Sequence, residues 1–317
     1  MRPRAEAVLD GSWEKPGRNP IGASIAGLLI TGALYTTLGG LILSVVALII
    51  SSHDKSWVRT DNFVDFLLSY YQKFQVPILV VTAVMEFAVF FGITLLLVRR
   101  WHSSQPSRYL SYNPPAALDL ILAGLGAVAV VPIAELLDSW SYILFPVLRE
   151  LQNGESSLLS IHSAGKAALV IFAVSITPAI CEEAIFRGWL QHTIRRKASA
   201  TVSIIVTGVI FALFHMSPLS IVALAFVGFY LGYLFERCGT LFASMVAHCI
   251  YNFTIIALVN VNLKLPWLVT TSGDIALPAM IGSVAVFVLV ILGMELKAMW
   301  RNRAVRSPAA PRQSPAG

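Results

Sequence analysis

Eight apolar runs divide this sequence, and they constrain its fold more than any other feature. They cover about residues 21–50, 76–98, 116–137, 167–190, 199–217, 219–236, 240–261 and 277–298. A run of about 20 apolar residues can cross the hydrocarbon core of a bilayer as a helix. Because a spanning segment must satisfy its own backbone hydrogen bonds, these runs predict an all-α polytopic membrane protein with about eight transmembrane helices.

The composition agrees with this class and excludes others. Of the 317 residues, 56% are hydrophobic and 13% are charged, whereas a soluble domain carries about 25% charged residues. The net charge of +6 does not indicate a nucleic-acid partner, because the basic residues flank the apolar runs. We expect membrane lipid as the surroundings. The three cysteines form no CxxC pair, so no disulfide framework is expected.

Basic residues also predict the orientation of the spans. Of the 23 Lys and Arg residues, sixteen fall on the side that would hold both termini, six fall on the other side, and Arg187 lies within a span. Since cytoplasmic loops are enriched in basic residues, we expect both termini in the cytoplasm. The short loops and few cysteines favour a bacterial plasma membrane.

The chain divides into five predicted parts. We expect a cytoplasmic segment at 1–20, three transmembrane helices with their loops at 21–163, a core with polar residues at 164–261, a final transmembrane helix at 262–303 and a disordered tail at 304–317. Two connections also predict structure of their own. Asp61–Phe74 has apolar residues at helical spacing, and Trp140–Leu159 shows a weaker pattern. For both we favour an ordinary amphipathic loop helix over an interfacial helix.

Three neighbouring apolar runs carry polar side chains that hydrocarbon excludes. These residues are Glu182, Glu183, Arg187, His215, His248 and Asn252. Ionisable groups at membrane depth are costly, and they usually face a protein or water-filled interior where they serve a function. Glu182 and His215 are equally far from the turn at 198–199, so both should lie about 20–25 Å from that membrane face. His248 and Asn252 lie at about 14 and 20 Å along their own helix, so all three runs place polar groups at similar depth.

Spacing within each run assigns these residues to helix faces. His248 and Asn252 are four residues apart and share a face, and Glu183 and Arg187 have the spacing of an ion pair. Glu182 points about 100° away from Glu183 and can face a cavity. Pro178 should bend its helix nearby. Among the remaining charged residues, Glu86 lies near the middle of its span, deep enough to line a cavity, but the sequence identifies no partner for it. Asp119 and Glu135 lie towards span ends, where we expect structural roles. The sequence shows no internal repeat.

These motifs resemble those of the CPBP family of intramembrane proteases, which includes the CAAX prenyl endopeptidases and the bacteriocin-processing and self-immunity (Abi) proteins. The family's EExxxR, FxxxH and HxxxN motifs match Glu182–Arg187, Phe211–His215 and His248–Asn252 in the same order. The resemblance covers about residues 165–257. It implies a CAAX-protease-like core that hydrolyses membrane-associated peptides or proteins. It also implies that Glu182 is the general base, that His215 helps to activate water, and that His248 and Asn252 stabilise the oxyanion.

The residues leave two questions open. Glu182, His215 and His248 could bind zinc as three protein ligands, although Asn252 suits an oxyanion better than a metal. We favour a glutamate mechanism without a cofactor and keep zinc as the alternative. A non-proteolytic scaffold or self-immunity protein with the same fold is the second candidate function. A proton-coupled transporter is disfavoured, because the sequence shows no duplicated halves.

Overall fold

The computed structural model describes residues 7–53, 63–144, 157–218, 220–261 and 276–306. The regular structure of these residues is helical throughout, which confirms the predicted class. They form eight apolar rods: α1 (Pro20–His53), α2–η2–α3 (Phe63–Met85, Glu86–Phe91, Gly92–Trp101), α5 (Ala117–Leu144), α7–η3–α8–η4–α9 (Ala164–Val170, Ile171–Ile176, Thr177–Glu183, Ala184–Gln191, His192–Arg195), α10 (Ala200–Phe214), α11 (Ile221–Cys238), α12 (Leu241–Asn260) and α13 (Leu277–Arg306). A short helix, α4 (Pro106–Tyr109), follows α3.

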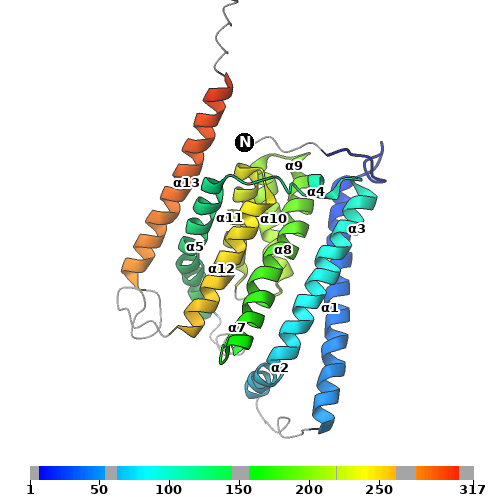
Figure 1. Ribbon diagram of the computed structural model, residues 1–317, viewed down its shortest axis with the longest axis vertical. Helices are drawn as coiled ribbons and strands as arrows, with labels where there is room; N and C mark the ends of the chain where they lie inside the picture. The colour runs from blue at the N-terminus through cyan, green and yellow to red at the C-terminus, as the bar shows by residue number, and fades with distance from the viewer. Residues whose placement is uncertain (1–6, 54–62, 145–156, 219, 262–275, 307–317) are drawn as a thin grey trace, which may run out of the picture.

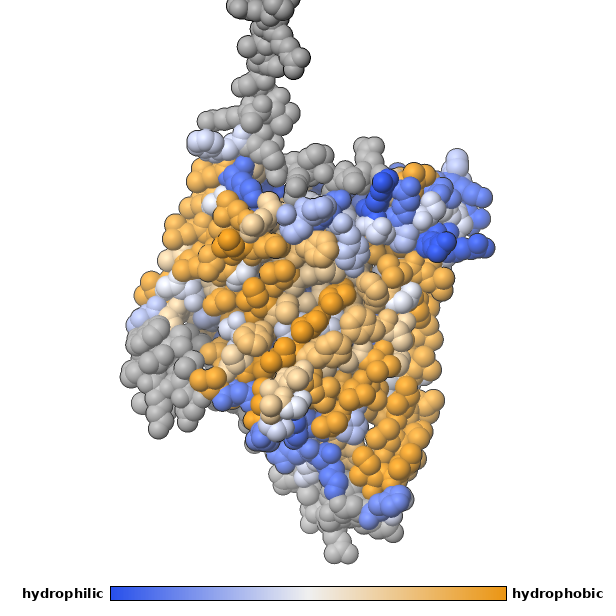
Figure 2. Space-filling view, viewed as in Figure 1, coloured by the Kyte–Doolittle hydropathy of each residue, from blue (hydrophilic) through white to orange (hydrophobic). Residues whose placement is uncertain are grey.

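Seven of these rods are long and apolar enough to cross a membrane, and α10, at 15 residues, is shorter. We expected the fifth span to extend over 199–217, but α10 ends at Phe214. His215 caps the helix, and Met216 then adopts a left-handed conformation with φ of 50°, which stops the helical turn. Figure 2 shows a broad hydrophobic face between hydrophilic ends, as a bilayer-embedded protein requires.

The two connections predicted to hold extra helices differ in outcome. The segment Asp61–Phe74 is helical from Phe63 and continues directly into the second rod, so it is not a separate helix. In the second connection, α5 continues to Leu144, and residues 145–156 lie outside the described part of the chain. The predicted tail lies outside it as well from residue 307, after α13 has continued to Arg306.

Close packing of the rods surrounds the middle of the α7–α9 rod. Helix α8 packs against α12 and η2, while α10 packs against α11, and α5 packs against α11, α12 and α13. Gly208 and Gly228 bring α10 and α11 together: a Cβ on Gly228 would lie 2.9 Å from the Cα of Gly208. These two glycines therefore permit close helix approach, as their small size predicts.

The segment before α1 is hydrogen-bonded to the end of the second rod. The N–H groups of Gly11 and Trp13 donate hydrogen bonds to the carbonyls of His102 and Trp101, at 3.1 and 2.9 Å. Glu14 accepts from both Arg196, at 2.6 and 2.8 Å, and Nδ1 of His102, at 2.7 Å. In Figure 1 this blue segment, α9 and the red end of α13 all lie at the upper end of the molecule, so the two ends of the described chain share one face.

Candidate active site

The paired glutamates lie at the end of α8, between two π-helical segments. Pro178 lies within α8 and has no N–H, so it cannot donate to the carbonyl of Val174 four residues earlier. That carbonyl accepts a hydrogen bond from Nδ2 of Asn252 on α12, at 2.8 Å. The proline thus frees an acceptor that joins the α7–α9 rod to α12 beside the glutamates.

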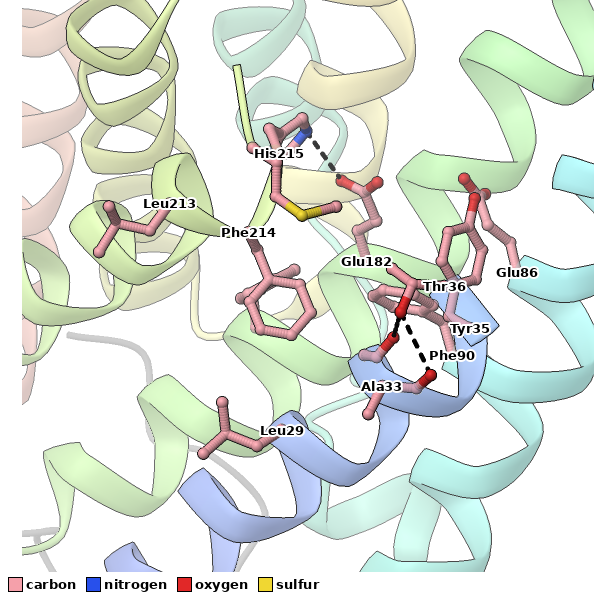
Figure 3. A pocket seen from close by; sticks show the side chains of 13 residues that line it. Leu29, Ala33, Tyr35, Thr36, Glu86, Phe90, Glu182, Leu213, Phe214 and His215 are labelled. Atoms are coloured by element: carbon pink, nitrogen blue, oxygen red, sulfur yellow. Dashed lines mark hydrogen bonds and ion pairs between the residues drawn. The ribbon is translucent and has the colours of Figure 1, made fainter. Parts of the chain in front are cut away.

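Glu182 lies between two imidazole rings from other helices. Its Oε2 atom is 3.8 Å from Nε2 of His215, at the end of α10, and 4.0 Å from Nε2 of His248 on α12. The side chain of Glu182 is 15% exposed, and Oε2 accepts no hydrogen bond from the described residues. In Figure 3 its carboxylate is directed at His215. These distances are too long for direct hydrogen bonds but suit a bridging water molecule.

The Nδ1 atom of each imidazole, which faces away from Glu182, is hydrogen-bonded to the protein. Nδ1 of His215 lies 2.8 Å from the carbonyl oxygen of Phe211, and Nδ1 of His248 lies 3.0 Å from Oε1 of Glu183. Since a carbonyl oxygen only accepts, the geometry assigns the Nδ1 proton to His215. The neutral ring then presents Nε2 to Glu182 as an acceptor.

Glu183 forms a buried ion pair with Arg187, as their spacing predicts. Oε1 of Glu183 accepts from Nη1 of Arg187 at 2.7 Å, and both side chains are fully buried. Nη2 of Arg187 donates to the carbonyl of Gly228 at 3.1 Å, and its guanidinium lies 4.5 Å from the centre of the Phe211 ring. Glu183 therefore links Arg187 to His248, and this contact between Glu183 and His248 is one that the sequence did not predict.

Two cavities meet at Glu182 and His215, which line both. The α1-side cavity, of about 500 Å³, lies among α1, η2, α8 and the end of α10, and its other lining residues include Leu29, Tyr35, Glu86, Phe90 and Phe214. The α5-side cavity, of about 390 Å³, is lined also by Glu135, Asp138, His248, Tyr251 and Asn252. Glu182 is therefore reachable from both sides.

Comparison with known families identifies the segment that holds this cluster. Residues 164–254 match the family described as type II CAAX prenyl endopeptidase Rce1-like. This segment belongs to the CPBP family of membrane proteases. No curated protein and no solved structure matches the chain. The CPBP segment contains all six polar residues singled out from the sequence, and membership supports a protease embedded in the membrane.

The site of this CPBP segment also includes carboxyl groups whose roles the sequence left unclear or assigned otherwise. Glu86 lines the α1-side cavity, which its depth in the second span allowed but did not establish. Glu135 was expected to have a structural role near a span end, but it lines the α5-side cavity together with Asp138. Their spacing of three residues places both on one face of α5, and this spacing was the available signal. Asp119, by contrast, pairs with Lys297 at 2.6 Å, which agrees with a structural role.

The metal question can be tested on the donor geometry. Among the described residues, no group of three or more His, Cys, Asp and Glu side chains is arranged to hold a metal ion. Glu182, His215 and His248 are the three residues that the sequence offered as zinc ligands by their side-chain types. Nδ1 of His248 is hydrogen-bonded to a carboxylate, which is common for metal-binding histidines. However, Oε2 of Glu182 and the Nε2 atoms of His215 and His248 do not form a metal-binding group in this conformation.

Proposed function

We propose that this protein is an intramembrane endopeptidase in which Glu182 activates water. The observation that carries the proposal is the separation of 3.8 Å between Oε2 of Glu182 and Nε2 of His215. Both atoms are acceptors when the carboxyl group is ionised and the ring is neutral. A water molecule has two O–H donors, so it can donate to both and turn a lone pair towards a peptide carbonyl.

The proposed reaction is hydrolysis of a peptide bond. The water oxygen attacks the carbonyl carbon, Glu182 accepts a water proton, and the carbonyl oxygen becomes an oxyanion. When the C–N bond breaks, Glu182 returns the proton to the leaving nitrogen, so that a carboxylic acid and an amine are formed. The same carboxyl group thus serves first as base and then as acid.

His248 and Asn252 are the proposed oxyanion donors. Glu183 lies 3.0 Å from Nδ1 of His248 and can stabilise its imidazolium form, in which Nε2 is also a donor. One N–H of the Asn252 amide is used by Val174, which fixes the amide, and the other is left for the substrate. Fixed donors of this kind are worth about 3–4 kcal/mol each to the transition state.

The proposed substrate is a membrane-associated peptide or protein, cleaved in C-terminal processing of the CAAX type or in peptide maturation. We also propose that both termini lie in the cytoplasm, on the charge of the loops, and that the membrane is a bacterial plasma membrane, on the short loops and few cysteines. A reporter fused after Lys197 should then give a cytoplasmic signal, and an outside signal there would reverse the orientation.

The test of the enzyme is Glu182→Gln in the full chain. The change keeps the shape of the side chain but removes the base, so turnover of peptides in reconstituted membranes should fall by at least about 100-fold. Near-normal turnover would show that Glu182 is not the base. If neither protein cleaves any peptide and both fully support the cellular role, the scaffold alternative holds instead.

A further inference from the structure

The two cavities are acidic, and their lining residues include no lysine or arginine among the residues that the structure describes. Four carboxyl groups line them: Glu86 and Glu182 in the α1-side cavity, and Glu135 and Asp138 with Glu182 in the α5-side cavity. The two histidines that also line them, His215 and His248, are engaged with the glutamate pair.

Elsewhere in the described chain, buried and half-buried carboxylates pair with a basic residue. The pairs are Glu14 with Arg196, Asp119 with Lys297, Glu183 with Arg187, Glu236 with Arg195 and Glu295 with Arg237. Protein interiors pair buried charges because an isolated one is costly. The carboxyl groups of Glu86, Glu135 and Asp138 depart from this rule, and they are the ones that face the cavities.

Glu86 is the clearest case. It begins η2, is only 5% exposed, and its Oε2 accepts no hydrogen bond from the described residues. In Figure 3 Glu182 lies between His215 and Glu86, so Glu86 occupies the wall of the α1-side cavity beyond the base. The rest of that wall is largely apolar, including Leu29, and it would suit an aliphatic chain that ends in a hydrogen-bond donor.

The opposite cavity repeats the arrangement with two groups. Asp138 accepts a long hydrogen bond of 3.4 Å from Ser220 at Oδ2, and its Oδ1 is buried with no partner in the described residues. Glu135 lies one helical turn away on the same face of α5. Together they bring two carboxyl groups to the cavity that also holds His248 and Asn252.

We propose that the site selects peptides with a lysine or arginine side chain on each side of the scissile bond. One basic group would be bound by Glu86 in the α1-side cavity and the other by Glu135 and Asp138 in the α5-side cavity. A lysine side chain fits because its aliphatic stem contacts apolar walls while its ammonium group donates to a carboxylate. This inference rests on the proposed endopeptidase function and adds its substrate class.

The test compares lysine with norleucine, its uncharged analogue, in a library of lipid-anchored peptides given to the full chain in nanodiscs. Cleavage products are identified by mass spectrometry. A charge-assisted contact should favour lysine by about 10- to 100-fold in kcat/KM on each side of the bond. Glu86→Gln should remove the preference on one side only, and Glu135→Gln combined with Asp138→Asn should remove it on the other.

The control is Glu295→Gln, which neutralises a carboxylate that lines neither cavity and should leave both preferences unchanged. Equal cleavage of lysine and norleucine peptides by the unaltered protein would overturn the inference. The inference would also be overturned if the lysine preferences persist in Glu86→Gln and in Glu135→Gln combined with Asp138→Asn. If Glu86→Gln does not fold, the variant at the half-buried Glu135 and Asp138 still tests the inference.

Binding separates this inference from the hydrolytic function. The Glu182→Gln protein is titrated with the same fluorescent peptides, and anisotropy should show tighter binding of the lysine form by a similar factor. If no peptide is cleaved but this preference is present, the proposed hydrolysis fails and the basic-peptide site stands. If cleavage depends on Glu182 but lysine and norleucine bind equally, the hydrolysis stands and the basic-peptide site is refuted.

Discussion

Replacement by glutamine should have different effects at the two adjacent glutamates: it should lower stability at Glu183 and activity at Glu182. Glu183→Gln would leave the Arg187 guanidinium, which is fully buried, without the carboxylate that it contacts directly. Removing one partner of a buried pair costs about 3–5 kcal/mol. The hydrogen bond to Gly228 and the contact with Phe211 remain, but neither supplies negative charge. We therefore expect the folded-to-unfolded ratio to fall by a factor of roughly 100 or more, since each 1.4 kcal/mol is tenfold.

Glu182→Gln is the matched control. The side chain of Glu182 is partly exposed, and its Oε2 accepts no hydrogen bond from the described chain. We expect its free energy of unfolding to change by less than about 1 kcal/mol, as for substitutions that break no buried interaction. Glu182→Gln should lose more activity than Glu183→Gln, because Glu182 is the proposed base whereas Glu183 supports His248.

The assay is unfolding in mixed micelles of mild detergent and dodecyl sulfate, followed by tryptophan fluorescence, to which the buried Trp189 contributes. A second variant, Glu183→Gln with Arg187→Met, removes both charges. It should recover most of the loss, because no unpaired charge is then left buried. A Glu183→Gln protein as stable as the unaltered one, or a double variant less stable than the single one, would contradict this role of the ion pair.

Three other predictions concern different parts of the molecule. Gly228→Ala should destabilise the protein by about 1–3 kcal/mol, measured by the same unfolding assay, because the new Cβ would press on the backbone of α10; unchanged stability would contradict this packing. Activity should persist when purified protein is assayed with a tight zinc chelator, and loss of activity that added zinc restores would refute the glutamate mechanism. Acid should release the N-terminal segment. Burial alone would raise the pKa of Glu14, but the hydrogen bonds and charge of Arg196, with the hydrogen bond from His102, bring it below its usual value. Burial also lowers the pKa of His102, only partly offset by Glu14. Both groups thus hold fewer protons when the protein is folded. Their contribution to stability is therefore present at neutral pH and is lost as pH falls through their lowered pKa values. Limited proteolysis before α1 should increase on acidification in the unaltered protein and depend less on pH in Glu14→Gln.

The sequence predicted the helices well because hydrocarbon restricts a spanning backbone to few solutions. It also predicted which polar residues meet, since equal distance from a turn in an antiparallel pair gives equal depth. The end of α10 was harder to predict. His215 and Met216 stop the helix through a local backbone conformation, and apolar composition alone does not reveal it.

Contacts between distant helices were the part that spacing could not supply. The hydrogen bond from Asn252 to the carbonyl of Val174 depends on which acceptor Pro178 leaves free and on how α12 is rotated. The place of Glu135 in a cavity wall likewise depends on how α5 packs. A charge near the end of a span can face headgroups or protein, and only the packing decides between them.

The π-helical segments of the second and fourth rods have a consequence for how the sequence of this protein can vary. Each of η2, η3 and η4 contains wider turns than the α-helices on either side of it. Losing one residue from η3 would turn everything after it by about 100° about the rod axis. Glu182 would then leave His215 although every motif residue was still present. Inherited variation in these stretches should therefore consist of exchanges of one side chain for another, with insertions and deletions confined to the connections between rods.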